Sequence, residues 1–121
     1  MSAFGDLAAT SPQQLAPGYL ARAVHGGRLT LAVIEIEPDA ELPEHSHENE
    51  QLGLVLRGSV TWRVGEEQRT VAAGGTWRIP PGTPHLVRGG ADGAVVVDVF
   101  APAREEWKSL EELPSAPPRW P

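Results

Sequence analysis

The sequence predicts an all-β fold, in which short strands close into a small barrel or sandwich. Apolar and β-branched runs recur between Tyr19 and Phe100, and each run ends at a turn signal. The chain has 13 glycines and 12 prolines in 121 residues, which favours frequent turns over long helices. Regular alternation of short strands and turns is typical of antiparallel sandwiches and barrels.

Eight strands are expected in order along the chain, because each apolar run is bounded by residues that favour a reversal. Reversals are expected at Gly26-Gly27 and Pro38-Asp39 early in the chain, and later at Arg57-Gly58, Gly65-Glu66, Gly74-Gly75, Pro80-Pro81-Gly82 and Gly89-Gly90. The expected strands comprise residues 19–24, 28–37, 51–56, 60–64, 68–71, 76–79, 85–88 and 94–100.

The two ends of the chain are expected to lie outside the barrel, which we place at residues 19–102. Residues 1–18 show little pattern and are expected to form a non-regular arm. A short helix is expected at residues 103–110, because a proline precedes it. Residues 103–121 thus comprise this helix and a Pro-rich tail, which Trp120 is expected to pin to the barrel or to a partner subunit.

Composition excludes several classes of protein. The net charge of −6 argues against nucleic acid as a partner. The chain has no cysteine, so disulfides, thiolate metal ligands and a cysteine nucleophile are excluded. No apolar run reaches the length of a membrane span or of a signal-peptide core. We therefore expect one cytoplasmic domain without membrane contact.

Three histidines and a glutamine predict a metal site, because imidazole is the commonest protein ligand of first-row divalent metals. His45, His47 and Gln51 share odd parity, so one continuous strand would direct them to the same face. His85 would complete the site if the fold returns the chain. Glu50 has the opposite parity and would replace Gln51 only if a bulge separated the two. Zinc, nickel, iron and manganese all accept this ligand set.

The opposite face of the strand at residues 51–56 is apolar and needs a cover. It carries Leu52, Leu54 and Leu56. A second sheet or a second subunit would shield these leucines from water. We therefore expect a homodimer.

Asp98 stands in an otherwise apolar strand at residues 94–100. A carboxylate in such a run is costly unless it is paired or hydrogen-bonded. Two interpretations remain open. Asp98 is either a structural residue satisfied by neighbouring donors, or an acid/base that faces the cavity.

These motifs resemble the cupin signature, Gly-x5-His-x-His-x3-Glu-x6-Gly followed by Gly-x5-Pro-x-Gly-x2-His-x3-Asn. The resemblance covers most of the chain and implies a double-stranded β-helix, the jelly-roll barrel. The matching residues are His45, His47, Gln51 and Gly58 in the first half, and Gly74, Pro80, Gly82 and His85 in the second.

The chain departs from the signature at Asp39 and Gly89, which replace the first glycine and the final asparagine. It departs again at Gln51, which replaces the usual glutamate of the metal site. A neutral amide leaves the metal its full positive charge. The metal is then expected to be a stronger Lewis acid and less inclined to redox cycling.

The segment after Asp98 further resembles the small cupins of pectin and alginate breakdown, which open unsaturated uronates to linear keto sugars. The resemblance implies that Asp98 shuttles a proton, Phe100 shapes the sugar pocket and Arg104 holds the substrate carboxylate. It also implies an isomerase- or lyase-like enzyme that uses a divalent metal, acts on an anionic sugar and needs no redox cofactor.

Other functions remain open. The chain also resembles the single-cupin cyclases and isomerases of polyketide-type secondary metabolism. An apolar, aromatic pocket would favour these, with Trp62 and Trp77 in its wall unless both serve only packing. A metal-dependent sensor or sugar-binding module would bind a small molecule without turnover. A dioxygenase would require iron and oxygen-dependent turnover.

Overall fold

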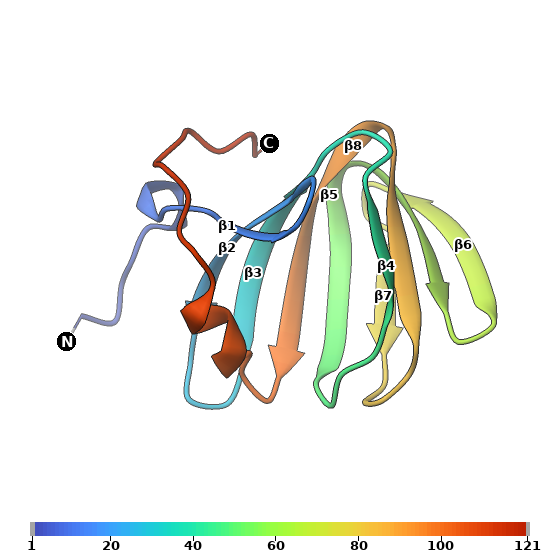
Figure 1. Ribbon diagram of the computed structural model, residues 1–121, viewed down its shortest axis with the longest axis horizontal. Helices are drawn as coiled ribbons and strands as arrows, with labels where there is room; N and C mark the ends of the chain where they lie inside the picture. Colours follow the sequence, from blue (N-terminus) through green and yellow to red (C-terminus); the bar gives the residue numbers. More distant parts are fainter. Residues whose placement is uncertain (1, 121) are drawn as a thin grey trace.

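The computed structural model describes residues 2–120 and is built almost entirely of antiparallel strands, as predicted (Figure 1). No helix among residues 2–120 has both the length and the apolar character needed to cross a membrane. The elements are η1 (Leu7–Ala9), β1 (Gln13–Ala16), β2 (Tyr19–His25), β3 (Thr30–Ile36), β4 (Glu41–His45), β5 (Glu50–Val64), β6 (Glu67–Ala72), β7 (Thr76–Ile79), β8 (His85–Ala101) and η2 (Glu105–Ser109).

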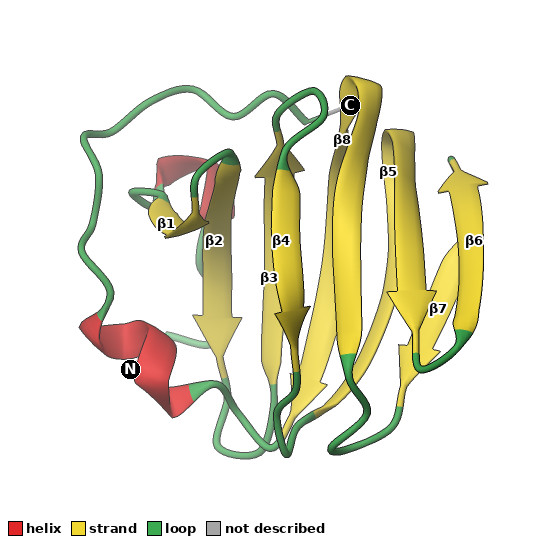
Figure 2. Ribbon diagram, turned by 45° about the vertical axis from the view of Figure 1, so that its right-hand side comes forward, coloured by secondary structure: helices red, strands yellow, loops and turns green. Residues whose placement is uncertain are grey.

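Two long strands, β5 and β8, organise the sheet. They pair with each other along most of their length, and the sheet runs in the order β1-β2-β3-β8-β5-β6. β4 pairs with the first part of β8 and β7 with the first part of β5, so both long strands have different neighbours at their two ends. The strands therefore curve around one interior, as Figure 2 shows.

Two predicted reversals, at Arg57-Gly58 and Gly89-Gly90, are wrong, because β5 and β8 run through them. The β5–β8 register shifts on either side of Gly58, so the strand bends there without ending. Gly58 has φ 79°, and a Cβ at this position would collide with the backbone of Gly93. The glycine thus marks a close approach of two strands within a bend.

The N-terminal arm is less irregular than expected. Gln13–Ala16 form β1, which pairs with the free edge of β2, and the Gln13 side chain donates to the carbonyls of Trp107 and Leu110. The helix expected at residues 103–110 is only the short 3-10 segment η2, whose Trp107 N–H bonds the Arg104 carbonyl. Met1 and Pro121 lie outside the described residues.

The C-terminal tail returns along the outside of the barrel (Figure 2). It covers a buried ion pair between Arg22 and Glu35, whose side chains lie on adjacent strands β2 and β3. Arg119 contacts the same carboxylate at 2.7 Å, and the Arg22 guanidinium lies 5.9 Å from the centre of the Trp120 ring. Trp120 and its neighbour thus attach the tail to the barrel.

The cover expected over the leucine face of β5 is absent from residues 2–120. Leu52, Leu54 and Leu56 are 47%, 37% and 38% exposed. Leu31 of β3 is 38% exposed, and the β3–β8–β5 register aligns it with Leu52 across β8. We call these four leucines the outer apolar face.

Candidate metal centre

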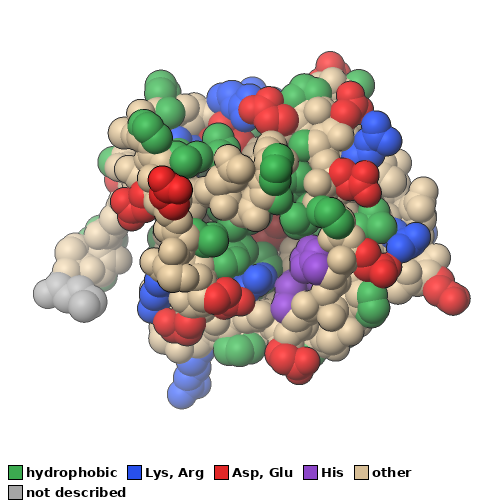
Figure 3. Space-filling model, viewed as in Figure 1, with side chains coloured by type: hydrophobic (Ala, Val, Ile, Leu, Met, Phe, Trp, Pro, Cys, Tyr) green, Lys and Arg blue, Asp and Glu red, His purple; other side chains and the backbone are tan. Residues whose placement is uncertain are grey.

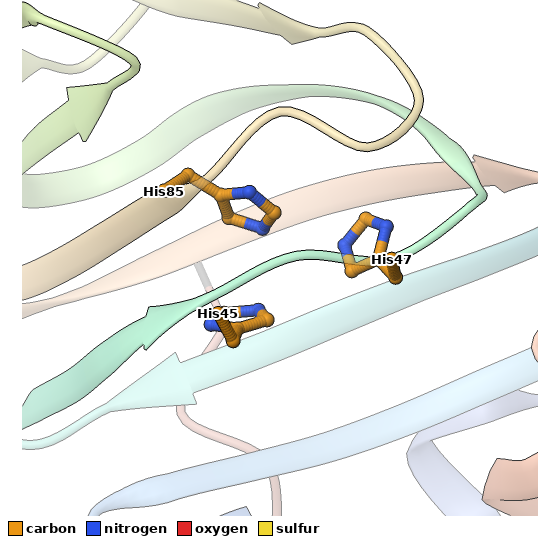
Figure 4. A group of neighbouring side chains, drawn as sticks. All are labelled: His45, His47 and His85. Carbon is orange, nitrogen blue, oxygen red and sulfur yellow. The ribbon is translucent and has the colours of Figure 1, made fainter.

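Three histidine rings converge where β4 ends and β8 begins (Figure 4). His45 is the last residue of β4 and pairs in register with His85, the first residue of β8. His47 lies in the loop before β5. One ligand atom from each ring lies within 4.8 Å of the others. The parity argument assumed one continuous strand from 45 to 51, but residues 46–49 form a loop, and this loop directs His47 to the site.

Each of the three rings bonds a backbone carbonyl through Nδ1, and His47 Nε2 also lies near the Gln51 amide oxygen. Every Nδ1 lies against a backbone carbonyl, which can only accept, so Nδ1 carries the proton and Nε2 keeps its lone pair. The His85 Nε2 atom is buried and has no hydrogen-bond partner among residues 2–120. This pattern fits a metal ligand set with oriented rings. The carbonyls belong to Pro43 for His45 (2.9 Å), Asn49 for His47 (3.0 Å) and Thr83 for His85 (2.7 Å).

Burial keeps the imidazoles of His47 and His85 neutral. The pKa of His85 is lowered to about 4, chiefly by burial and also by the neighbouring histidines and Arg104, while the bond to Thr83 acts in the opposite direction. Burial also lowers the pKa of His47, and Arg104 adds to that effect. Metal binding requires the neutral imidazole, so His47 and His85 are ready for a cation at neutral pH.

Gln51 joins the histidines, whereas Glu50 is exposed. The Gln51 Oε1 atom lies 3.2 Å from His47 Nε2. The Nε2 atom of the same Gln51 amide donates to Asp98 Oδ1 over 3.0 Å. Because an ionised carboxylate can only accept, Asp98 orients the amide with its oxygen toward the histidines.

Asp98 is hydrogen-bonded and also lines the cavity, so both interpretations of this residue have support. Its Oδ1 accepts from Gln51 and from the Trp77 indole Nε1, the latter over 2.7 Å. No hydrogen bond reaches Oδ2 from residues 2–120. Burial raises the pKa of Asp98 to about 6, against the effect of the two donors and of Arg104.

A glycine lets Trp77 reach Asp98 across an intervening strand. Gly53 of β5 pairs with Asp98 of β8 on one side and with Trp77 of β7 on the other. A Cβ at Gly53 would collide with both Asp98 Oδ1 and Trp77 Nε1. Neither role considered for Trp77 from the sequence, a pocket wall or packing alone, includes this bond to Asp98. An isolated glycine in an apolar strand signals such a close approach.

Arg104 is held at the cavity against two adjacent aromatic rings. Its guanidinium lies 4.8 Å from the centre of the Phe100 ring and 4.7 Å from that of Trp107. Its Nε donates to Glu106 over 3.1 Å, while its terminal nitrogens donate to no group in residues 2–120. The side chain is only 13% exposed. The structure thus brings Phe100 and Arg104 to the histidines, and Phe100 lies 6.0 Å from the His47 ring.

A cavity of about 380 Å³ connects these groups. In the space-filling view the histidines border a hollow whose other visible walls are largely apolar, with a basic side chain beside them (Figure 3). Arg104 is the only arginine that lines the cavity within the described residues. Trp62 lines it as well, and its indole Nε1 is buried without a partner in residues 2–120, whereas Trp77 does not line it.

Comparison with known proteins identifies this architecture. The sequence model of one family, described as the cupin domain, matches residues 32–100, more than half of the chain. No curated protein sequence matches the chain. KdgF from Halomonas sp. and an RmlC-like cupin from Shewanella frigidimarina each superpose with a TM-score of 0.80 at 23% identity. Both alignments cover 88% of this chain, and they cover 98% and 96% of those chains respectively.

A larger protein contains the same fold. An oxalate decarboxylase variant from Bacillus subtilis superposes with a TM-score of 0.74 at 20% identity, over 93% of this chain and 34% of that one. Another structure of that enzyme concerns its Mn(II) centres. At these identities the likeness concerns the fold alone, and it confirms the predicted jelly-roll barrel.

Proposed function

Because the chain belongs to the cupin domain family, we propose that it is a metal-dependent enzyme that moves a proton on a small anionic molecule without a redox cofactor. The observation that carries this proposal is Asp98, a buried carboxylate beside the candidate metal ligands. One of its oxygens is held by two donors, and the residue lines the cavity.

His45, His47, His85 and Gln51 would hold the divalent metal, through the three Nε2 atoms and the amide oxygen. A bound ion would supply Lewis-acid polarisation of substrate oxygens. It would also pull the pKa of Asp98 below its metal-free value of about 6.

The remaining roles fall to residues around the cavity. Arg104 offers two unpaired terminal nitrogens in a planar fork, which suits a carboxylate. The two adjacent aromatic rings hold this fork in place before the substrate arrives. Asp98 takes and returns the proton, and Phe100 forms the wall between Arg104 and His47.

The first candidate substrate is an unsaturated uronate. Opening its hemiacetal frees an aldehyde and an enol, and proton transfer from oxygen to carbon turns the enol into a ketone. The reaction is redox-neutral, so a proton carrier, a cation for the carboxylate and a Lewis acid suffice. The test is to incubate metal-loaded protein with unsaturated galacturonate and guluronate monomers. Formation of the linear keto sugar above the spontaneous rate is expected, and no acceleration would refute the sugar substrate.

The apolar cavity wall favours a second candidate, a cyclase or isomerase of the polyketide type. Trp62 contributes an aromatic surface to that wall. Such an enzyme would use the same metal and the same Asp98 on a less polar substrate. Specific binding of a small acid without any turnover would instead indicate a metal-dependent binding module.

The outer apolar face supports a homodimer. Its four leucines come from β3 and β5 and form one exposed surface on the opposite side of the sheet from the cavity. A second copy would bury an identical patch by twofold symmetry.

A further inference from the structure

We propose that the ligand of this cavity carries an apolar body of several carbon atoms, which enters the barrel beyond the histidines while a carboxylate stays at Arg104. This inference rests on the proposed role of Arg104 and deepens it. Of the two candidate substrates above, it favours the less polar one and names its class as an amphipathic carboxylic acid.

The strand register shows how far the cavity extends. Phe100 pairs with Gln51 at the histidine end, and Val96 pairs with Ile34 farther along the same strand. All four residues line the cavity. At about 3.3 Å per residue, Val96 lies about 13 Å along β8 from Phe100. The cavity therefore continues well past the candidate metal ligands.

Beyond Asp98, the inner wall offers few groups for a sugar hydroxyl to bond. The Tyr19 hydroxyl is already shared between the carbonyls of Ala40 (2.9 Å) and Val87 (3.1 Å). Most of the other inner lining side chains are aliphatic, among them Ile34, Val60 and Val96, and the Trp62 indole adds one unpaired donor, its Nε1. Hydroxyl groups placed there would lose their bonds to water without replacement, whereas methylene groups would gain from burial.

The polar groups gather at the opposite end of the cavity. Arg104 has two free terminal nitrogens, and Glu106 engages only its Nε. The ligand that matches this distribution has one anionic end and one apolar end. The volume of about 380 Å³ lies within the range of small-molecule pockets, about 300–1,000 Å³, which is enough for such a body.

Straight-chain carboxylates provide the probe. Butanoate, hexanoate and octanoate are titrated into metal-loaded protein by calorimetry, with galacturonate as the polar comparison. The affinity is expected to rise about fourfold per methylene until the cavity is filled. An affinity that does not change with chain length overturns the inference. If affinity rises with chain length but uronates are not turned over, the inference holds and the sugar substrate is refuted. Failure of the inference and failure of the sugar substrate can therefore be told apart.

One pair of substitutions, on the inner and the outer face of β8, locates the apolar part of the binding site. Val96→Phe fills the inner cavity and should abolish the gain from butanoate to octanoate, while Val97→Phe, on the opposite face of β8, should preserve it. Val60→Leu is a milder filling variant if Val96→Phe fails to fold, and it should shorten the chain length at which affinity levels off. If the inner and outer variants show the same dependence of affinity on chain length, the placement of the apolar body is overturned.

Arg104→Gln tests the position of the carboxylate. It should weaken the binding of all three acids at least tenfold and leave the dependence of affinity on chain length unchanged. Unchanged affinities overturn the position of the carboxylate.

Discussion

The amide of Gln51 donates to Asp98 over 3.0 Å, and this bond connects a candidate metal ligand with the candidate proton carrier. The same carboxylate oxygen also accepts from Trp77. Asp98 therefore does two things at once: it orients the amide oxygen of Gln51 toward the histidines, and it lines the cavity with a carboxylate. These two roles can be separated by choice of substitution.

Asp98→Asn keeps the role of Asp98 in orienting Gln51 and removes its role as a proton carrier. The carbonyl oxygen of the new side chain can still accept from Gln51 and Trp77, so metal content should match that of the unmodified protein. The side chain can no longer carry the proton, so turnover should fall about 10²- to 10⁴-fold. Metal analysis and a rate assay on the same sample check this. Full activity would remove Asp98 from the mechanism.

Asp98→Leu removes the acceptor altogether and leaves the Gln51 amide without its partner. Metal affinity should then fall about 10- to 100-fold, because the oriented ligand is lost. Competition with a chelator of known affinity measures the change. An affinity equal to that of Asp98→Asn would show that the bond does not orient Gln51.

Gly53→Ala tests the close approach that joins Trp77 to Asp98. The added methyl would collide with both partners, so the free energy of unfolding should fall by about 1–3 kcal/mol. Gly27→Ala is the matched control, because no atom lies within 4 Å of its added methyl. Its effect should stay within about 0.5 kcal/mol. Equal losses in urea denaturation would contradict the packing described around Gly53.

Several of these features could be predicted from the sequence, because they depend on local pattern. The turn-rich alternation predicted the all-β fold, and the spacing of His45, His47 and His85 predicted that their rings meet. Other features depend on how strands pass one another. The sequence predicts a reversal at Gly58, where the structure has a bulge inside a long strand. A bulge and a true turn can both place a glycine between two apolar runs, so the local sequence does not distinguish them.

The partner of Asp98 was equally inaccessible from sequence. Trp77 reaches it only because β7, β5 and β8 lie side by side with Gly53 between them, and this register is a property of the whole sheet. The cavity wall combines residues from several strands, so its apolar character also appears only in three dimensions.

The buried carboxylate of Glu35 predicts a pH dependence of stability. Burial raises its pKa, but the bonds from Arg119 and Arg22 outweigh this and hold it below the ordinary value of 4.5. Because the pKa of Glu35 is lower in the folded chain than in the unfolded chain, its ionised carboxylate stabilises the fold at pH values above the unfolded-state pKa. This stabilisation is lost as the pH falls through the folded-state pKa. Between about pH 5 and about pH 3, the free energy of unfolding should fall more steeply than in Glu35→Gln. The exposed Glu66→Gln variant serves as control and should follow the unmodified protein. Parallel curves for Glu35→Gln and the unmodified protein would argue against this contribution.

The outer apolar face predicts a dimer that a single charge disrupts. Leu54→Lys places an ammonium group within this face and should shift the protein toward a monomer, as measured by analytical ultracentrifugation. Gln68→Lys, on the exposed strand β6, should leave the association unchanged. A monomer in the unmodified protein, or an undisturbed dimer in Leu54→Lys, would exclude this face as the interface.

The most direct test of the metal centre is anomalous diffraction from crystals grown with a divalent metal, recorded at the absorption edge of that metal. We expect one peak within bonding distance of the Nε2 atoms of His45, His47 and His85 and of the Gln51 amide oxygen. A peak elsewhere, or a site occupied through the histidines with Gln51 turned away, would contradict this account.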